Sequence, residues 1–243
     1  MSAPDARRVA VVTGGARRLG RHLCQSLARR GYDIVIVYRA SGEDARSLER
    51  EIASAGGRAR TLKMDVAAKQ EVAAAFADIA RVEEHVDLLI NNVGNYNPQD
   101  VTKLSPDVWD ETIAANLSGA YYCCHHALGL MPDGGNIINI GMAGLEGIRA
   151  STRGADYYVS KTGLLVLTRA LAAGYASRHI RVNMVSPGQL ENSVDLPPGD
   201  QISRWVPLGR SGTLDDIAQA VHYLLDAGYV TGVNIDVAGG YRL

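Results

Sequence analysis

The stretch Thr13-Gly14-Gly15-Ala16-Arg17-Arg18-Leu19-Gly20 joins a short apolar run, Arg8 to Thr13, to an amphipathic segment that stops at Gly31. A glycine-rich turn between a strand and a helix lets backbone N–H groups and the helix dipole face a pyrophosphate. Gly14 and Gly20 stand where a side chain would obstruct that approach. Glycines also simply end strands, so the turn alone leaves a structural interpretation open.

Apolar, β-branched runs recur along the rest of the chain and predict further strands: Asp33 to Tyr38, Ala59 to Val66, Val86 to Val93, Asn136 to Ile140, Ile180 to Ser186 and Val233 to Val237. Continuous apolarity of this kind is typical of strands buried on both faces. Helical segments lie between them, with start signals at Ser41-Gly42-Glu43-Asp44, Ser105-Pro106 and Thr213-Leu214-Asp215-Asp216. The alternation predicts one α/β domain over residues 1–243, a doubly wound, Rossmann-like parallel sheet with helices on both faces.

Composition narrows the class of partner. The chain has 243 residues, 47% of them hydrophobic, and 25 Lys and Arg against 26 Asp and Glu, for a net charge of -1. No strong field favours nucleic acid or an anionic membrane, so we expect a small-molecule substrate and neither of those partners. We find no signal-peptide apolar region and no apolar run that could span a bilayer, which predicts a cytoplasmic protein.

The cysteines predict no metal and no disulfide framework. They are Cys24, Cys123 and Cys124, an odd number without Cys-x-x-Cys spacing, as expected in a reducing cytoplasm. In Cys123-Cys124-His125-His126, successive side chains on a helix point about 100° apart and cannot converge on one tetrahedral ion.

One long irregular stretch, from Gly188 to about Ser203, carries Pro197-Pro198-Gly199. Long loops in compact domains are often binding loops, so we expect this one to cover the substrate. A plain flexible connection is the alternative.

The second apolar run ends in Tyr38-Arg39-Ala40-Ser41, where NAD-binding folds usually carry an acidic residue for the ribose 2′-hydroxyl. A guanidinium can instead pair bidentately with a 2′-phosphate, and the Ser41 hydroxyl can add a hydrogen bond. With no carboxylate expected near Arg39, NADP(H) is the predicted cofactor, although a solvated strand end is the alternative. Asp65 and Val66, which close the third run, are placed to contact the adenine.

Tyr157-Tyr158-Val159-Ser160-Lys161 runs into a leucine-rich segment, so we expect a helix with Tyr157 and Lys161 one turn apart. A phenol ionises near pH 10, and a neighbouring ammonium favours the phenolate, which would make Tyr157 usable as a general acid or base. The spacing also arises by chance on helix surfaces.

Together these motifs resemble the short-chain dehydrogenase/reductase family over essentially the whole chain. The matching elements follow the family's order: the Thr13–Gly20 turn, Asp65, Asn91-Asn92-Val93-Gly94, Asn116, Tyr157 with Lys161, and Ser186-Pro187-Gly188. The resemblance implies that Tyr157 protonates the substrate, that Lys161 binds the nicotinamide ribose and that Asn116 holds a water in a proton relay. It also implies a homotetramer, paired through the helices that hold Asn116 and Tyr157.

The resemblance further implies a set of cofactor-binding positions, with Ser193 the weaker one: Gly14, Arg18, Leu19, Gly20, Asn91, Asn92, Gly94, Pro187, Gly188 and Ser193. Arg18 replaces the family's third turn glycine, and a Thr-Gly-x-x-x-Arg-x-Gly turn looks like the pteridine reductase branch. Arg39 and Tyr96 also match that branch, in which an aromatic ring stacks on the pterin. The substrate predicted from this likeness is a pterin or a dihydrofolate-like heterocycle between the nicotinamide and Tyr96, bordered by Arg18 and Met142.

Met142 is the second departure, because the family's catalytic serine, or the branch's aspartate, belongs at this place and a thioether cannot donate a proton. Ser151, Thr152 or Asp156 could fold back into the missing role. Two other functions stay open: a carbonyl reductase for 3-oxoacyl or other ketones, and a catalytically weak NADP(H)-binding sensor.

Overall fold

A computed structural model describes residues 7–147, 151–191, 193 and 201–242. Within these residues seven parallel strands form one sheet in the order β3-β2-β1-β4-β5-β6-β7. They are β1 (Arg8–Val12), β2 (Tyr32–Tyr38), β3 (Ala59–Lys63), β4 (Leu88–Asn91), β5 (Asn136–Ile140), β6 (Arg181–Pro187) and β7 (Asn234–Val237). The strand order reverses direction between β1 and β4, which is where open α/β sheets bind their ligands.

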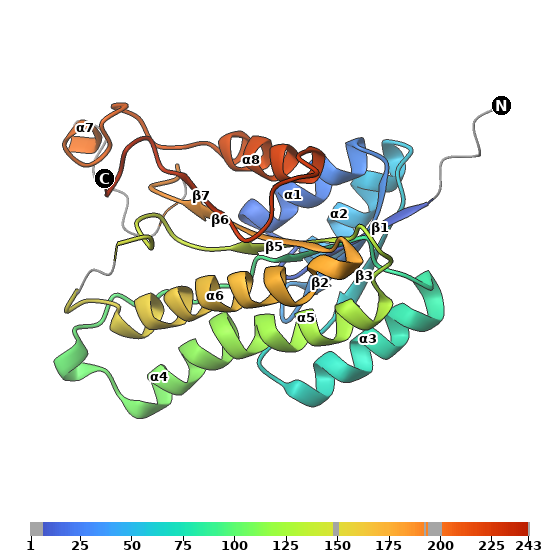
Figure 1. Cartoon of the computed structure of the whole chain (residues 1–243), viewed down its shortest axis with the longest axis horizontal. Coiled ribbons are helices and arrows are strands. Elements are labelled where there is room, and N and C mark those ends of the chain that lie inside the picture. Colours follow the sequence, from blue (N-terminus) through green and yellow to red (C-terminus); the bar gives the residue numbers. More distant parts are fainter. Residues whose placement is uncertain (1–6, 148–150, 192, 194–200, 243) are drawn as a thin grey trace.

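Helices cover both faces of the sheet (Figure 1). One face carries α1 (Arg18–Arg29), α2 (Gly42–Ser54) and α8 (Leu214–Asp226), and the other carries α3 (Lys69–Glu83), α5 (Gly119–Leu130) and α6 (Ala155–Gly174). Shorter elements complete the described chain: η1 (Val101–Lys103), α4 (Pro106–Ile113), η2 (Ala114–Ser118), η3 (Ala176–Arg178) and α7 (Ile202–Trp205). The predicted fold is confirmed.

Each predicted strand is present, but two of them end at least two residues before the apolar runs do. β3 stops at Lys63, so Asp65 lies beyond the strand, and β4 spans only Leu88–Asn91, so Asn92 and Gly94 lie in the loop after it. Both differences place polar residues beyond the carboxyl ends of strands, where a ligand can reach them.

Local signals explain where the helices begin. Ser105 Oγ accepts a hydrogen bond from Val108 N at 3.3 Å, and Thr213 forms a capping box with Asp216. Each cap satisfies a backbone N–H that the helix itself cannot pair. Ser41 precedes α2 without capping it.

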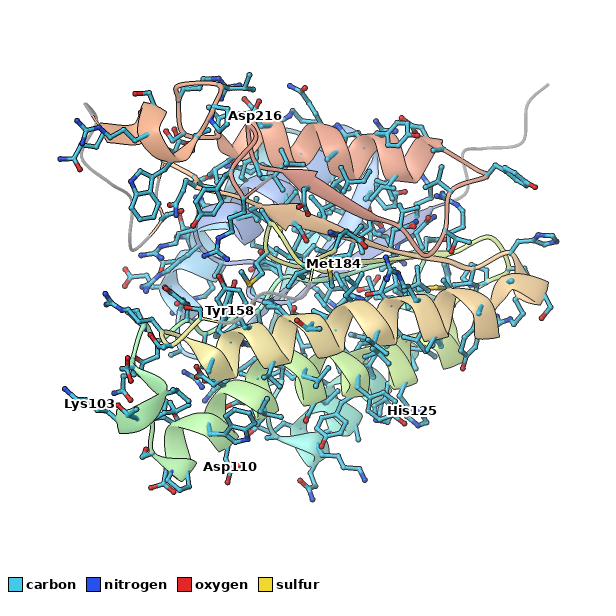
Figure 2. All side chains as sticks on the ribbon, turned by 60° about the vertical axis from the view of Figure 1, so that its left-hand side comes forward. Lys103, Asp110, His125, Tyr158, Met184 and Asp216 are labelled. Atoms are coloured by element: carbon cyan, nitrogen blue, oxygen red, sulfur yellow. The ribbon has the colours of Figure 1, made fainter. Side chains whose placement is uncertain are left out.

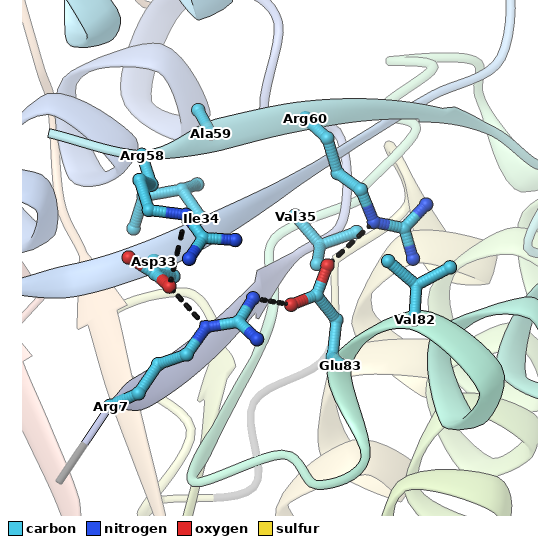
Figure 3. A pocket seen from close by; sticks show the side chains of 9 residues that line it. All are labelled: Arg7, Asp33, Ile34, Val35, Arg58, Ala59, Arg60, Val82 and Glu83. Atoms are coloured by element: carbon cyan, nitrogen blue, oxygen red, sulfur yellow. Dashed lines mark hydrogen bonds and ion pairs between the residues drawn. The ribbon is translucent and has the colours of Figure 1, made fainter.

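Ion pairs fill a small pocket at the amino-terminal edge of the sheet (Figure 3). Arg7 contacts both Asp33 and Glu83, and Arg60 Nε donates to Glu83 Oε1 at 2.8 Å. Glu83 ends α3 and is buried, so these contacts tie that helix to the starts of three strands. The network lies at the edge opposite to the ligand-binding edge of a parallel sheet, and its groups already pair with one another. We interpret it as structural.

The cysteines belong to the core. Cys123 and Cys124 are buried on α5, and burial raises the pKa of the Cys124 thiol to about 12. Among the described residues no group of His, Cys, Asp or Glu is arranged to hold a metal ion. No helix in this part of the chain is both long and apolar enough to cross a membrane.

Candidate active site

A cleft at the carboxyl ends of the strands gathers most of the predicted substrate-side residues. It holds about 740 Å³, a volume that includes the open solvent at its mouth. Its lining includes seven residues predicted from sequence: Arg18, Tyr96, Met142, Tyr157, Pro187, Gly188 and Ser193. Five others line it that were not predicted: Ala143, Tyr158, Gln189, Tyr241 and Arg242.

A second hollow lies on the other side of the glycine turn. It is lined by Gly14, Val37, Tyr38, Arg39, Met64, Asp65, Val66, Val93, Asn95 and Ala115. Four of these were predicted to bind the cofactor: Gly14 at the pyrophosphate, and Arg39, Asp65 and Val66 at the adenosine half. The two hollows together have the arrangement expected for an extended cofactor that crosses the turn, with the adenosine at one end and the nicotinamide at the other.

Asn92 stabilises the glycine turn by hydrogen bonds to its backbone. Its Nδ2 donates to the carbonyl oxygens of Thr13 at 3.1 Å and Gly14 at 3.2 Å. A methyl group at Gly20 would lie 2.1 Å from the Gly14 oxygen, so no side chain fits there. The Asn92 side chain therefore shapes the turn by binding the turn's backbone carbonyls. The Leu19 side chain packs against the core.

Arg18 occupies a backbone conformation that favours glycine. Its φ is 47°, in the left-handed region, which explains why a glycine is usual at this place in the turn. An arginine there costs about 1–2 kcal/mol of backbone strain. The side chain is exposed and lines the cleft.

The expectation that no carboxylate lies near Arg39 is wrong. β2 and β3 are neighbours in register, with Tyr38 opposite Lys63, so the residues just beyond the two strands meet. Arg39 Nη1 lies 3.5 Å from Asp65 Oδ2, and Asp65 Oδ1 accepts from Ala67 N at 3.0 Å. The Arg39 side chain is 66% exposed, so this long contact is weak and leaves the guanidinium accessible to a phosphate.

Tyr157 and Lys161 lie one turn apart on α6, as predicted. Lys161 is buried, its Nζ donates to the Ile140 carbonyl at 2.7 Å, and the same nitrogen lies 5.8 Å from the centre of the Tyr157 ring. A side chain at Gly94 would come within 3.2 Å of Nζ, so the glycine leaves room for the ammonium. Desolvation lowers the pKa of Lys161 to about 8, so the group keeps its charge at neutral pH.

Asn116 lies in a π-helical turn, Ala114–Ser118, inserted between α4 and α5. Figure 2 labels Asp110 and His125 toward the two ends of this long interrupted helix. The Asn116 amide is buried: its Oδ1 accepts from Asn95 N at 2.7 Å, and its Nδ2 donates to Asn95 O at 2.9 Å and to Ser160 Oγ at 3.2 Å. The side chain thus joins the loop after β4 to α6. Its role in a water relay stays a prediction.

Asn91 does not reach the cofactor groove. Its Nδ2 donates to Asn139 Oδ1 at 2.9 Å and to Cys124 Sγ at 3.3 Å, so the amide points into the core beneath the sheet. The chain continues from Asn139 Nδ2 to Thr168 Oγ1 at 2.9 Å. These amides support the site from the interior without lining it.

The three residues predicted to replace the missing donor at Met142 lie elsewhere in the described structure. Asp156 is fully buried between α4 and α6, where its Oδ2 accepts from Thr112 Oγ1 at 2.6 Å. Ser151 Oγ donates to Arg153 O at 2.9 Å, and Thr152 O accepts from Val101 N. None of these three predicted substitutes lines the cleft.

The loop predicted to cover the substrate, from about 188 to 203, is described only in part. Gly188, Gln189 and Ser193 line the cleft, and Ser193 Oγ accepts from Leu190 N at 2.9 Å. Residues 192 and 194–200, which include Pro197-Pro198-Gly199, lie outside the described residues. Gln189 is only 7% exposed, and its Oε1 has no hydrogen-bond partner. The sequence analysis missed this residue, and the one signal for it was its position directly after Pro187-Gly188.

Comparison with known proteins agrees with this geometry. The family model described as enoyl-(acyl carrier protein) reductase matches residues 14–242. The chain belongs to the short-chain dehydrogenase/reductase family. It is 31% identical to a 3-oxoacyl-[acyl-carrier-protein] reductase of Aquifex aeolicus, over 96% of each chain. It is 34% identical to carbonyl reductase family member 4 of Danio rerio, over 97% of this chain and 98% of the relative.

A solved structure extends the likeness to three dimensions. A blue fluorescent protein from a metagenomic library, in complex with NADPH, superposes with a TM-score of 0.90 at 33% identity, covering 97% of this chain and 98% of the other. The chain is therefore a short-chain dehydrogenase/reductase along its described length, and an oxidoreductase by family.

Proposed function

We propose that this short-chain dehydrogenase/reductase reduces ketones with NADPH, in the manner of 3-oxoacyl and other carbonyl reductases. The observation that carries the proposal is the Tyr157 and Lys161 pair, which stands at an open cleft beside the glycine turn. The two curated relatives are named for ketone or carbonyl reduction, and the structural relative was solved with NADPH. Reduction of a pterin, the substrate predicted from sequence, is therefore our second candidate function.

When bound, the nicotinamide supplies the hydride that the carbonyl carbon accepts. The Tyr157 hydroxyl donates a proton to the carbonyl oxygen, and the Lys161 ammonium stabilises the negative charge that this transfer leaves on the ring oxygen. Burial strengthens this interaction, because little water is present to screen it. Asn92 and Gly20 would keep the turn open for the pyrophosphate, and Arg39 and Ser41 would bind the 2′-phosphate.

The pterin alternative keeps one specific observation in its favour. The Tyr96 ring lies in the cleft, 5.0 Å from the Tyr157 ring centre and edge-on to it, and Arg18 lines the same wall. A flat heterocycle could stack there, with offset stacking worth about 0.5–1.5 kcal/mol. Met142 counts against it, because the second proton donor of that branch is missing.

A substrate screen separates the candidates. We expect 3-oxoacyl thioesters or simple ketones to be reduced with NADPH, followed as loss of NADPH absorbance, while dihydropteridines and dihydrofolate stay inert. Efficient pterin reduction with inert ketones would reverse the order of the two proposals, and Tyr96→Ala should then raise the pterin KM. Binding of NADPH without oxidation by any compound would instead favour a sensor.

Arg39→Ala should weaken NADPH binding about 10- to 100-fold and change NADH binding little, because charge-assisted hydrogen bonds contribute about 1.5–3 kcal/mol. Fluorescence titration of the two cofactors measures the ratio. Arg50→Ala is the matched control: it removes an exposed guanidinium from α2 that lines neither hollow, and it should leave the affinity for both cofactors unchanged. Equal affinity of the wild-type protein for both cofactors would refute the 2′-phosphate assignment.

We also propose a cytoplasmic homotetramer. Tyr121 on α5 and Val159 and Val166 on α6 are exposed by 47%, 48% and 65%, an apolar surface on the two helices that the resemblance assigns to subunit pairing. Such patches often mark interfaces. Sedimentation of the wild-type protein against Val166→Glu measures the assembly state.

A further inference from the structure

The last turn of the chain forms one wall of the cleft. Arg242 lines it, and its guanidinium lies 5.0 Å from the centre of the Tyr158 ring and 4.9 Å from that of Tyr241. Tyr241 N donates to the Ala238 carbonyl at 3.0 Å, and Leu208 N donates to Gly239 O at 3.0 Å, so this segment is tied to its surroundings. The rings of Tyr158 and Tyr241 therefore hold the Arg242 guanidinium in the cleft, and Tyr158 is the residue next to Tyr157 on α6.

The charged side chains that line the described part of the cleft are all positive. Arg18 lines it from the glycine turn and Arg242 lines it from the chain's last turn, while no Asp or Glu is among the described lining residues. Neither guanidinium forms an ion pair with a described carboxylate. The other lining groups are aromatic, apolar or uncharged, and Gln189 adds a buried oxygen without a partner. A ligand that enters thus meets two available guanidinium groups and one unpaired amide oxygen.

We propose that Arg242 binds an anionic group on the substrate, a carboxylate or a phosphate, so that the preferred substrate is a ketone with a negatively charged tail. This rests on the proposed ketone reduction and names its substrate class. Arg18 lies in the turn that faces the cofactor's pyrophosphate, so the cofactor's own charge offsets it. Arg242 is the cation left for the substrate, and a guanidinium matches carboxylate or phosphate oxygens in bidentate geometry.

Matched substrate pairs test the proposal. The carboxylate arm compares 3-oxobutanoate, 4-oxopentanoate and 5-oxohexanoate with their methyl esters, because the distance from ketone to charge is not known in advance. The phosphate arm compares acetoacetyl-coenzyme A with the uncharged acetoacetyl N-acetylcysteamine thioester. We expect at least one charged member to exceed its neutral partner about tenfold or more in kcat/KM, and the arm that responds identifies the anion.

Arg242→Gln should raise KM for the charged member about 10- to 100-fold and lower its preference over the neutral partner toward unity, with the Kd for NADPH unchanged. Arg242→Lys should restore part of the preference. Arg29→Gln is the matched control, because it removes an exposed guanidinium from the far end of α1.

Several outcomes would overturn the proposal: neutral partners reduced as well as charged ones, an Arg242→Gln variant that slows both alike, or one that weakens NADPH binding instead. If no ketone is reduced at all, the proposed function fails, but the charge preference can still be decided. Calorimetric titration of the NADP complex with hexanoate and with methyl hexanoate, in the wild type and Arg242→Gln, then shows whether a carboxylate binds through Arg242 or does not.

Discussion

Tyr157→Phe should fold, bind NADPH with unchanged affinity and lose at least about a hundredfold in kcat, the typical contribution of a positioned general acid. The change removes one hydroxyl and keeps the ring that packs edge-on against Tyr96. Single-turnover reduction of a ketone, monitored by NADPH absorbance, measures the loss. The expected fall is in kcat with little change in KM, because the hydroxyl acts in the transition state.

Tyr175→Phe is the control, since Tyr175 directly follows the far end of α6 and its phenol lies outside the cleft. Its activity should match the wild type. Near-wild-type turnover of Tyr157→Phe would show that the proton reaches the substrate from another group.

Lys161→Met should lose a similar or larger share of activity while making the cofactor-free protein more stable. The pKa of Lys161 falls from 10.5 to about 8 because burial disfavours its charged form. At ~1.4 kcal/mol per pKa unit this corresponds to about 3 kcal/mol of destabilisation at neutral pH. Since the Met variant also loses the hydrogen bond to Ile140, we expect a net gain of about 1–3 kcal/mol in the free energy of unfolding.

The pH dependence tests the cause. A lowered lysine pKa means that the unfolded chain binds more protons between pH 8 and 10.5, so wild-type stability relative to the Met variant rises over that window. The gain from Lys161→Met should therefore be largest below pH 8 and shrink above it in urea titrations. Lys103→Met, at an exposed lysine, should show no such trend. A gain that stays constant with pH would mean that packing, not charge, is responsible.

The fold followed from sequence because its strands are buried on both faces and its helices carry local start signals. Helix caps such as Ser105 and Thr213 act within four residues, and continuous apolar runs identify the strands, so neither needs knowledge of distant contacts. The ends of the strands were predicted less accurately, because Met64 and Val66 are apolar and buried but lie beyond β3. Apolarity reports burial, and a loop can be buried as well as a strand.

The site was predictable where one local spacing sets the geometry, as for Tyr157 and Lys161 on a single helix. It was not predictable where the direction of a side chain depends on tertiary packing. Asn91 and Asn92 are neighbours, yet one enters the core and the other holds the glycine turn. Arg242 has no motif around it, and only the return of the last segment to the cleft places it among the lining residues. The proximity of Asp65 to Arg39 could have been inferred from the pairing of neighbouring strands.

The hydrogen-bonded amides of Asn91 and Asn139 have a consequence for how the sheet assembles. The two residues are direct partners across β4 and β5, in a region where nearly every other side chain is aliphatic. Aliphatic strands buried on both faces can slide past one another without changing which side chains are buried, so hydrophobicity specifies their alignment poorly. A shift by one residue would leave both amides buried and unpaired, at about 1–3 kcal/mol each. The pair therefore favours one alignment of β4 and β5. Through the hydrogen bond from Asn139 to Thr168 it also fixes the position on the sheet of α6, the helix that carries Tyr157.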